Sequence, residues 1–132
     1  MADFPSMAWM TEFQEKVNAD AELSVIGDWF DTAFAVTVDD KSFVLQVDHG
    51  RISRIVEDPG LDVRCAFGMR APGSVWGKFL ARDPEPLFHD FFAMLMRVPE
   101  FRLEGDTMVA MQNARALHRM MNIMREMGGA DA

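Results

Sequence analysis

Three histidines are the residues of this chain best suited to acid–base chemistry, and their surroundings argue against that use. His89 and Asp90 are adjacent, and adjacent side chains on a helix point about 100° apart, so Asp90 does not orient His89 as a general base. His49 precedes Gly50 in a pattern typical of a tight turn. His118 falls at the boundary between the apolar and polar faces of a helix. We therefore predict no catalytic residue among them.

Cys65 is the single cysteine of the chain, so no internal disulfide can form. It alternates with Val63 and Phe67 in the run Val63–Gly68, which predicts a small apolar residue facing inward and not a nucleophile. The histidines, cysteine and carboxylates do not have the spacing of a known metal-ligand motif. The nearby glycines do not form a phosphate-binding loop. The sequence thus predicts no metal, no cofactor and no enzymatic activity.

The composition favours one acidic globular domain over residues 1–132. The chain is 49% hydrophobic, and its 13 Lys+Arg against 21 Asp+Glu give a formal net charge of -8. This charge repels phosphate backbones and anionic lipid headgroups, so nucleic acid and membrane surfaces are poor partners. The stretch Met1–Phe13 lacks the basic start and long apolar run of a signal peptide. We expect a cytoplasmic protein without an integral membrane segment.

The apolar residues are unusual, with 12 Met, 11 Phe and no Tyr. The stretch Leu87–Met96, LFHDFFAMLM, is too short and too interrupted to span a bilayer. Such a stripe is most often ordinary core. Two neighbouring helices with wide apolar faces exceed what one small sheet buries, however, and a ligand pocket or a dimer interface would cover the excess. Methionine also suits adaptable binding surfaces.

Periodicity and turn signals predict the order helix, three strands, strand, two helices, strand, helix. Two helices are predicted in the middle of the chain, and Asp83-Pro84 is a strong start signal for the second of them. Asp106 is the expected cap of the last helix. The predicted ranges are a helix over 5–19, strands over 29–38, 42–47, 51–57 and 63–68, helices over 71–81 and 84–97, a strand over 101–104 and a final helix to about residue 124.

This order resembles the sterol-carrier-protein family of the type-2 kind over roughly residues 10–126. The segment Phe101–Asp106, FRLEGD, is similar to the family's strand that closes on Gly-Asp before an apolar last helix, here Met108–Met124. Trp29–Val36 is similar to its first strand, and Asp62–Gly68 to its strand that begins with an aspartate. One departure is the extra Phe-rich helix Pro84–Arg97, which falls where the family closes its ligand tunnel.

The resemblance implies an α+β fold with a five-stranded, mainly antiparallel sheet and helices packed on one face. It also implies a carrier of sterol, fatty acid or acyl-CoA ligands in an apolar tunnel, with no catalytic residues. We expect Leu87–Met96 to be a wall or lid over the sheet, with His89 as a polar end if it points inward. The predicted ligand-binding residues are Phe34, Phe43, Cys65, Phe67, Trp76, Phe79, Leu80, Phe88, His89, Phe91, Phe92, Leu95, Met96, Leu117, Met121 and Met124.

Two other functions stay open at this stage. The chain could be an accessory or substrate-presenting subunit of an enzyme system, or form a homodimer through its Phe-rich helix. It could also be a small cone-shaped α+β isomerase or cyclase, although that fold ends in a long curved sheet and this chain ends in a helix. The hydrophobic small-molecule carrier is the preferred interpretation.

Overall fold

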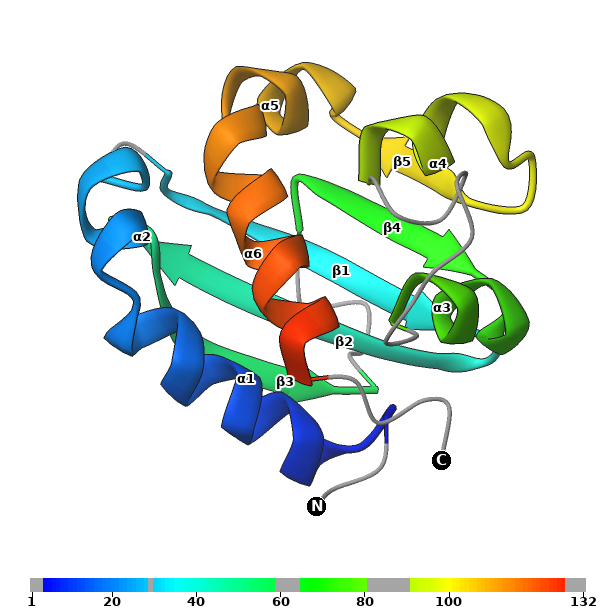
Figure 1. Cartoon of the computed structure of the whole chain (residues 1–132), viewed down its shortest axis with the longest axis horizontal. Helices are drawn as coiled ribbons and strands as arrows, with labels where there is room; N and C mark the ends of the chain where they lie inside the picture. Colours follow the sequence, from blue (N-terminus) through cyan, green and yellow to red (C-terminus); the bar gives the residue numbers. More distant parts are fainter. Residues whose placement is uncertain (1–3, 29, 59–64, 81–90, 128–132) are drawn as a thin grey trace.

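The computed structural model describes residues 4–28, 30–58, 65–80 and 91–127, without the side chains of Phe91 and Phe92 (Figure 1). Helices and strands follow one another in the predicted order, with one additional helix near the start and a divided helix at the end. The elements are α1 Met7–Ala19, α2 Ala21–Ile26, β1 Thr32–Val38, β2 Lys41–Asp48, β3 Arg51–Glu57, β4 Phe67–Ala71, α3 Gly73–Leu80, α4 Phe91–Arg97, β5 Arg102–Gly105, α5 Thr107–Gln112 and α6 Ala114–Met127.

The strands form a five-stranded sheet in the order β3-β2-β1-β4-β5. The pairs β1–β2, β2–β3 and β4–β5 are antiparallel, and β1–β4 is parallel. The predicted α+β fold with a mainly antiparallel sheet is therefore confirmed. Both hairpins turn through residues in the left-handed region, Asp39 at φ 55° in the first, and His49 at φ 51° and Gly50 at φ 75° in the second.

One face of the sheet is covered by α1, α3 and α6 (Figure 1). Alternation along β1 and β2 turns Phe34, Val36 and Phe43 toward these helices, and all three are fully buried. Helix α6 lays its buried residues along this face, and these are Ala116, Leu117, Met120, Met121, Ile123 and Met124. The apolar face expected in the last helix is thus the face that packs on the sheet and covers the core.

Helix α1 also covers the edge strand β3 by hydrogen bonding. The side chain of Asn18 accepts from the Ile52 N–H at 2.8 Å and donates to the Ile52 carbonyl at 3.0 Å. Gln14 donates to the same carbonyl at 2.9 Å. These amides satisfy backbone groups that an edge strand otherwise presents to other chains. The edge is therefore closed by helix side chains at Ile52.

The fourth strand begins later than predicted. The predicted strand was 63–68, and the predicted helix began at Ala71, whereas β4 spans Phe67–Ala71. Phe67, Met69 and Ala71 alternate along it, and all three are buried. Cys65 precedes the strand and is exposed, so the prediction of an inward-facing thiol was wrong. Residues that precede the first residue of a strand are not pleated with it, so alternation does not determine which way the Cys65 side chain points.

The helices near the ends differ from the prediction as well. The last helix is divided at Asn113, whose side chain donates to the Val109 carbonyl at 2.9 Å. Its predicted cap is confirmed, since Asp106 accepts from the Val109 N–H. Helix α2 was not predicted, although Asp20 caps it by accepting from the Leu23 N–H at 3.0 Å. Of the predicted helix 84–97, residues 84–90 lie outside the described part of the chain.

The tip of the β2–β3 hairpin rests on the segment after α2 through two glycines. A Cβ added at Gly50 would lie 2.7 Å from the Gly27 carbonyl oxygen and 2.8 Å from its Cα. The N–H of Gly50 donates to the Phe30 carbonyl at 3.1 Å. A side chain at position 50 would thus have to push two backbones apart while adopting a left-handed conformation.

We predict that Gly50→Ala lowers the free energy of unfolding by at least about 2 kcal/mol, combining left-handed strain with the backbone clash. Gly77→Ala is the matched control, because a Cβ at Gly77, inside α3, meets nothing within 4 Å. It should raise stability by about 0.5–1 kcal/mol through helix propensity. Urea unfolding of both variants measures this. Equal, small changes would contradict the described contact.

Candidate functional site

Most of the predicted ligand-binding residues lie in one interior cluster between the sheet and the helices α3 and α6. Each of them is 0–1% exposed, and Leu95 of α4 packs against the cluster from its edge. These residues all belong to the hydrophobic core, and their role in binding a ligand stays a prediction. The buried set comprises Phe34, Phe43, Phe67, Trp76, Phe79, Leu80, Leu117, Met121 and Met124.

The remaining predicted residues do not join this cluster or lie outside the description. Met96 is 83% exposed on α4, so its placement in the wall of the interior was wrong. Cys65 borders a hollow of about 230 Å³ whose lining includes Ala35 and Thr37, the side of the sheet away from α6. Phe88 and His89 fall outside the described residues, as do the side chains of Phe91 and Phe92. On α4 the described side chain that enters the core is Met94, which is fully buried.

Aromatic rings build the floor and one end of the interior. Phe34 of β1 stacks on Phe67 of β4, with ring centroids 5.4 Å apart and planes 6° apart. Trp76 of α3 meets Phe101 edge-on at 5.3 Å and Phe79 at 6.2 Å. The indole N–H of Trp76 donates to the Thr37 carbonyl at 3.0 Å, so the polar atom of this ring is already engaged. The surface left to the interior is apolar.

Arg125 is a polar group at the edge of this interior that sequence reasoning missed. Its Nε donates to the Phe79 carbonyl at 3.0 Å, and its guanidinium carbon lies 4.4 Å from the centroid of the Phe79 ring. Helix α6 is thereby joined to the C-terminal turn of α3 by a hydrogen bond and a cation–π contact. Only the tertiary fold brings these two residues together, since no local pattern links them.

The chemistry available inside is limited to apolar contact. Within the described residues, the one buried polar side chain is Thr37, which lies on the side of the sheet away from α6, and each buried side-chain nitrogen or oxygen has a hydrogen-bond partner. General acid–base catalysis needs a titratable group within reach of a bound substrate. The described interior supplies adaptable methionines and aromatic rings instead, which suit a nonpolar ligand.

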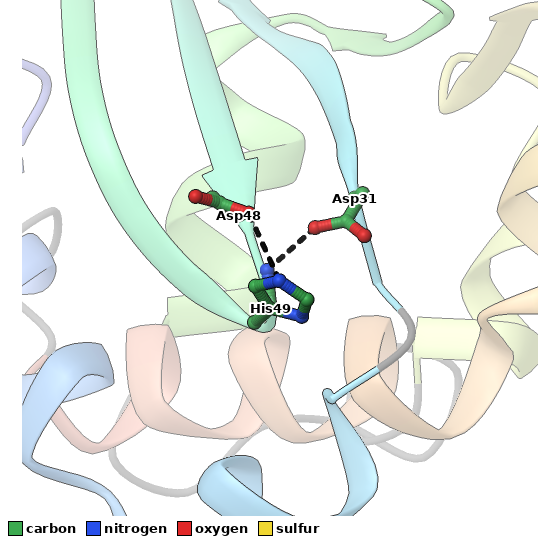
Figure 2. Close-up of side chains that lie close together, drawn as sticks. All are labelled: Asp31, Asp48 and His49. Carbon is green, nitrogen blue, oxygen red and sulfur yellow. Dashed lines mark hydrogen bonds and ion pairs between the residues drawn. The ribbon is translucent and has the colours of Figure 1, made fainter.

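The clearest polar cluster lies at the tip of the β2–β3 hairpin and joins Asp31, Asp48 and His49 (Figure 2). The His49 N–H donates to the Asp31 carboxylate at 2.6 Å, and His49 Nδ1 lies 2.9 Å from the Asp28 carbonyl oxygen. His49 Nε2 is 3.6 Å from the Asp48 carboxylate. All of these groups are exposed. The prediction that His49 is a turn residue is confirmed, and its contacts fasten the hairpin to the start of β1.

These contacts shift two pKa values in opposite directions. The hydrogen bond to the Asp28 carbonyl, followed by the charges of Asp31 and Asp48, raises the pKa of His49. The hydrogen bond from the His49 N–H lowers the pKa of Asp31. Such shifts make stability depend on pH, because the native state then favours one protonation state over the other.

The described fold is an α+β domain with the architecture seen in solved structures of sterol carrier proteins. The chain is similar to the crystal structure of a sterol carrier protein 2, with 21% identity, a TM-score of 0.72 and coverage of 90% of this chain and 95% of the other. It is similar to a Thermus thermophilus protein described as a possible sterol carrier protein, with 20% identity, a TM-score of 0.73 and coverage of 94% of this chain and 89% of that one.

A third similar structure is the UbiJ-SCP2 ubiquinone synthesis protein, with 13% identity, a TM-score of 0.58 and coverage of 89% of this chain and 96% of that one. At these identities the likeness establishes the fold. No family model and no curated protein matches the sequence. Among the described helices, none is both long and apolar enough to cross a membrane.

We predict that His49→Asn destabilises the fold most below pH 6.5 and least at alkaline pH. Asparagine tolerates the left-handed backbone, so the turn is kept. A raised histidine pKa gives stability that is fully present below the unfolded value of about 6.5 and is lost as pH rises through the folded value. Urea unfolding of both proteins between about pH 5.5 and 9 measures the difference. A difference that is constant over this range would contradict the contacts of the His49 ring.

Proposed function

We propose that this chain is a carrier for a lipid-like small molecule of the sterol, fatty acid or acyl-CoA class. The ligand is held between the sheet and the helices α3, α4 and α6. The observation that carries the proposal is an interior walled by rings and methionines, in which the described polar atoms are already paired. The likeness in fold to a sterol carrier protein 2 supports it.

Side-chain rearrangement would make room for the ligand. Met94, Met121 and Met124 enter the interior from two helices and are 0% exposed. Methionine has three rotatable bonds and fills irregular space, so a core rich in it can repack around a guest. Burying about 300 Å² of ligand apolar surface at roughly 25 cal/mol/Å² yields a gross gain of about 7 kcal/mol. Apolar walls alone give affinity with little discrimination between similar ligands.

This function requires neither a catalytic residue nor a cofactor, and it treats residues 1–132 as one domain. A single exposed thiol at Cys65 suits a reducing compartment, so the proposed location is the cytoplasm. The chain's own contribution is to exclude water from an apolar ligand while keeping an acidic, soluble exterior of net charge -8.

A second candidate function is that of an accessory subunit that presents its ligand to an enzyme. The observation favouring it is the likeness in fold to a ubiquinone synthesis protein, whose name places it in a biosynthetic system. The two functions are compatible, since a carrier can deliver its ligand to a partner. The same domain could also form a homodimer in which the α4 helices of the two copies contact each other.

We predict that a fatty acid carrying bromine atoms on its chain quenches Trp76, because bromine quenches tryptophan only at contact range and Trp76 is fully buried in the interior. Trp76→Phe should therefore remove most of the ligand-dependent quenching. Trp9→Phe, a change of the same size at a buried ring on α1 that is separated from Trp76 by Phe4, should remove less of it. Steady-state fluorescence titration of the three proteins measures this.

Circular dichroism and urea unfolding of both variants serve as controls for folding. A folded protein with no quenching at saturating fatty acid would contradict the carrier function. Quenching that is equally strong in Trp76→Phe and the parent protein would place the ligand outside the proposed interior.

A further inference from the structure

We infer that Asp31, Asp48 and His49 form a binding site for a divalent transition-metal ion such as Zn²⁺ at the tip of the β2–β3 hairpin (Figure 2). All three residues are exposed, so the site lies outside the proposed ligand interior and does not depend on what the interior binds. One ligand atom from each side chain lies within 4.8 Å of the other two. Two carboxylate oxygens and one imidazole nitrogen are a donor set that suits Zn²⁺ and its neighbours in the first transition row.

The pairing of β1 with β2 sets two carboxylates against each other. The last pair of the ladder at this end joins Thr32 to Val47. Asp31 and Asp48 follow that pair directly, one on each strand, and therefore leave the ladder side by side. Like charges that lie opposite each other across an antiparallel pair repel and destabilise the sheet. A bound cation would offset this repulsion, and the net charge of -8 on the chain favours its approach.

The ring of His49 is oriented as a metal ligand. A carbonyl oxygen only accepts hydrogen bonds, so His49 Nδ1, 2.9 Å from the Asp28 carbonyl oxygen, is the donor in that contact. In the neutral ring Nε2 then carries the lone pair, and it faces the Asp48 carboxylate 3.6 Å away. Two acceptors that face each other repel unless a proton or a cation lies between them. Metal-binding histidines commonly donate one ring N–H to a backbone carbonyl and bind the ion through the other nitrogen.

Backbone contacts hold the three groups near the spacing that an ion requires. The His49 N–H donates to the Asp31 carboxylate at 2.6 Å, and that carboxylate has a second oxygen that can bind an ion. The Gly50 N–H donates to the Phe30 carbonyl at 3.1 Å and fixes the hairpin tip. Zn²⁺ binds oxygen and nitrogen at about 2.0–2.2 Å, so its ligand atoms lie at most about 4.4 Å apart. Small rotations of the exposed carboxylates bring the present separations, all within 4.8 Å, to that value.

The negative charge at the hairpin tip is not matched by a nearby basic residue. Within the described part of the chain, no lysine or arginine forms an ion pair with Asp31 or Asp48. Arg51, which pairs with Asp48 across the hairpin, instead extends toward the Asn18 carbonyl at 3.5 Å. No spacing motif in the sequence predicts this set of ligands, because Asp31 reaches the other two residues only through the strand pairing.

The test is a titration of isotope-labelled, metal-free protein with Zn²⁺, followed by backbone amide resonances. A Cys65→Ser background keeps the exposed thiol from binding the ion. We expect saturable shifts at Asp31, Asp48 and His49, with a dissociation constant below about 1 mM. Mg²⁺ at the same concentrations should cause smaller shifts, because it prefers oxygen ligands and keeps its waters.

Two variants and a matched control make the result specific. Asp48→Asn and His49→Asn each remove one ligand and should weaken Zn²⁺ binding at least about tenfold. Asparagine has the size of aspartate and tolerates the left-handed backbone at position 49, so the turn is kept in both variants. Asp40→Asn removes an exposed carboxylate from the β1–β2 turn, at the other end of β1, and should leave the affinity unchanged. Circular dichroism and the unfolding midpoint check that each variant is folded.

Three results would overturn the inference. One is the absence of saturable shifts at the hairpin tip. Another is a Zn²⁺ affinity that is the same in Asp48→Asn, His49→Asn and the parent protein, because the ion would then bind elsewhere. The third is a response to Mg²⁺ as strong as the response to Zn²⁺, because the cluster would then be an acidic patch screened by any cation.

Discussion

The parallel pairing of β1 with β4 is the contact on which the rest of the structure depends. It joins the N-terminal meander to the C-terminal half of the chain and sets Phe34 opposite Phe67 and Val36 opposite Met69. Only with these side chains in register does the sheet present one continuous apolar face. Helix α6 then has a surface to bury its own apolar residues against, and α3 and α4 close the sides. The proposed ligand interior is a consequence of that register.

Local signals were enough to predict the antiparallel meander of β1, β2 and β3. Asp39-Asp40 and His49-Gly50 sit between alternating runs, and each pair forms the turn that its residues favour. The interior residues followed as well, because alternation on β1 and β2 and the seam of α6 each fix a face. Leu117, Met121 and Met124 were thus assigned to the interior without knowing what lay opposite them.

The predictions that failed concerned side chains whose positions depend on tertiary contacts and not on local sequence. Cys65 has the same alternation phase as Phe67 yet lies before the strand begins, and no local rule fixes that boundary. Met96 belongs to an apolar run, but the direction in which α4 docks leaves it in water. Arg125 reaches the Phe79 carbonyl, and Arg119 reaches Asp20, across long stretches of chain. Helix α2 has only six residues and one local signal, the Asp20 cap, and such a short pattern did not predict it.

A carrier of this fold must open its described interior to hold an apolar ligand. The most direct measurement is the mass of the purified protein under native and then denaturing conditions, followed by solvent extraction of whatever dissociates. The carrier account predicts a near-stoichiometric lipid, sterol or acyl species that leaves when the protein unfolds. A native mass equal to that of the bare 14.9 kDa chain, in a protein that also takes up no fluorescent fatty acid, would contradict it.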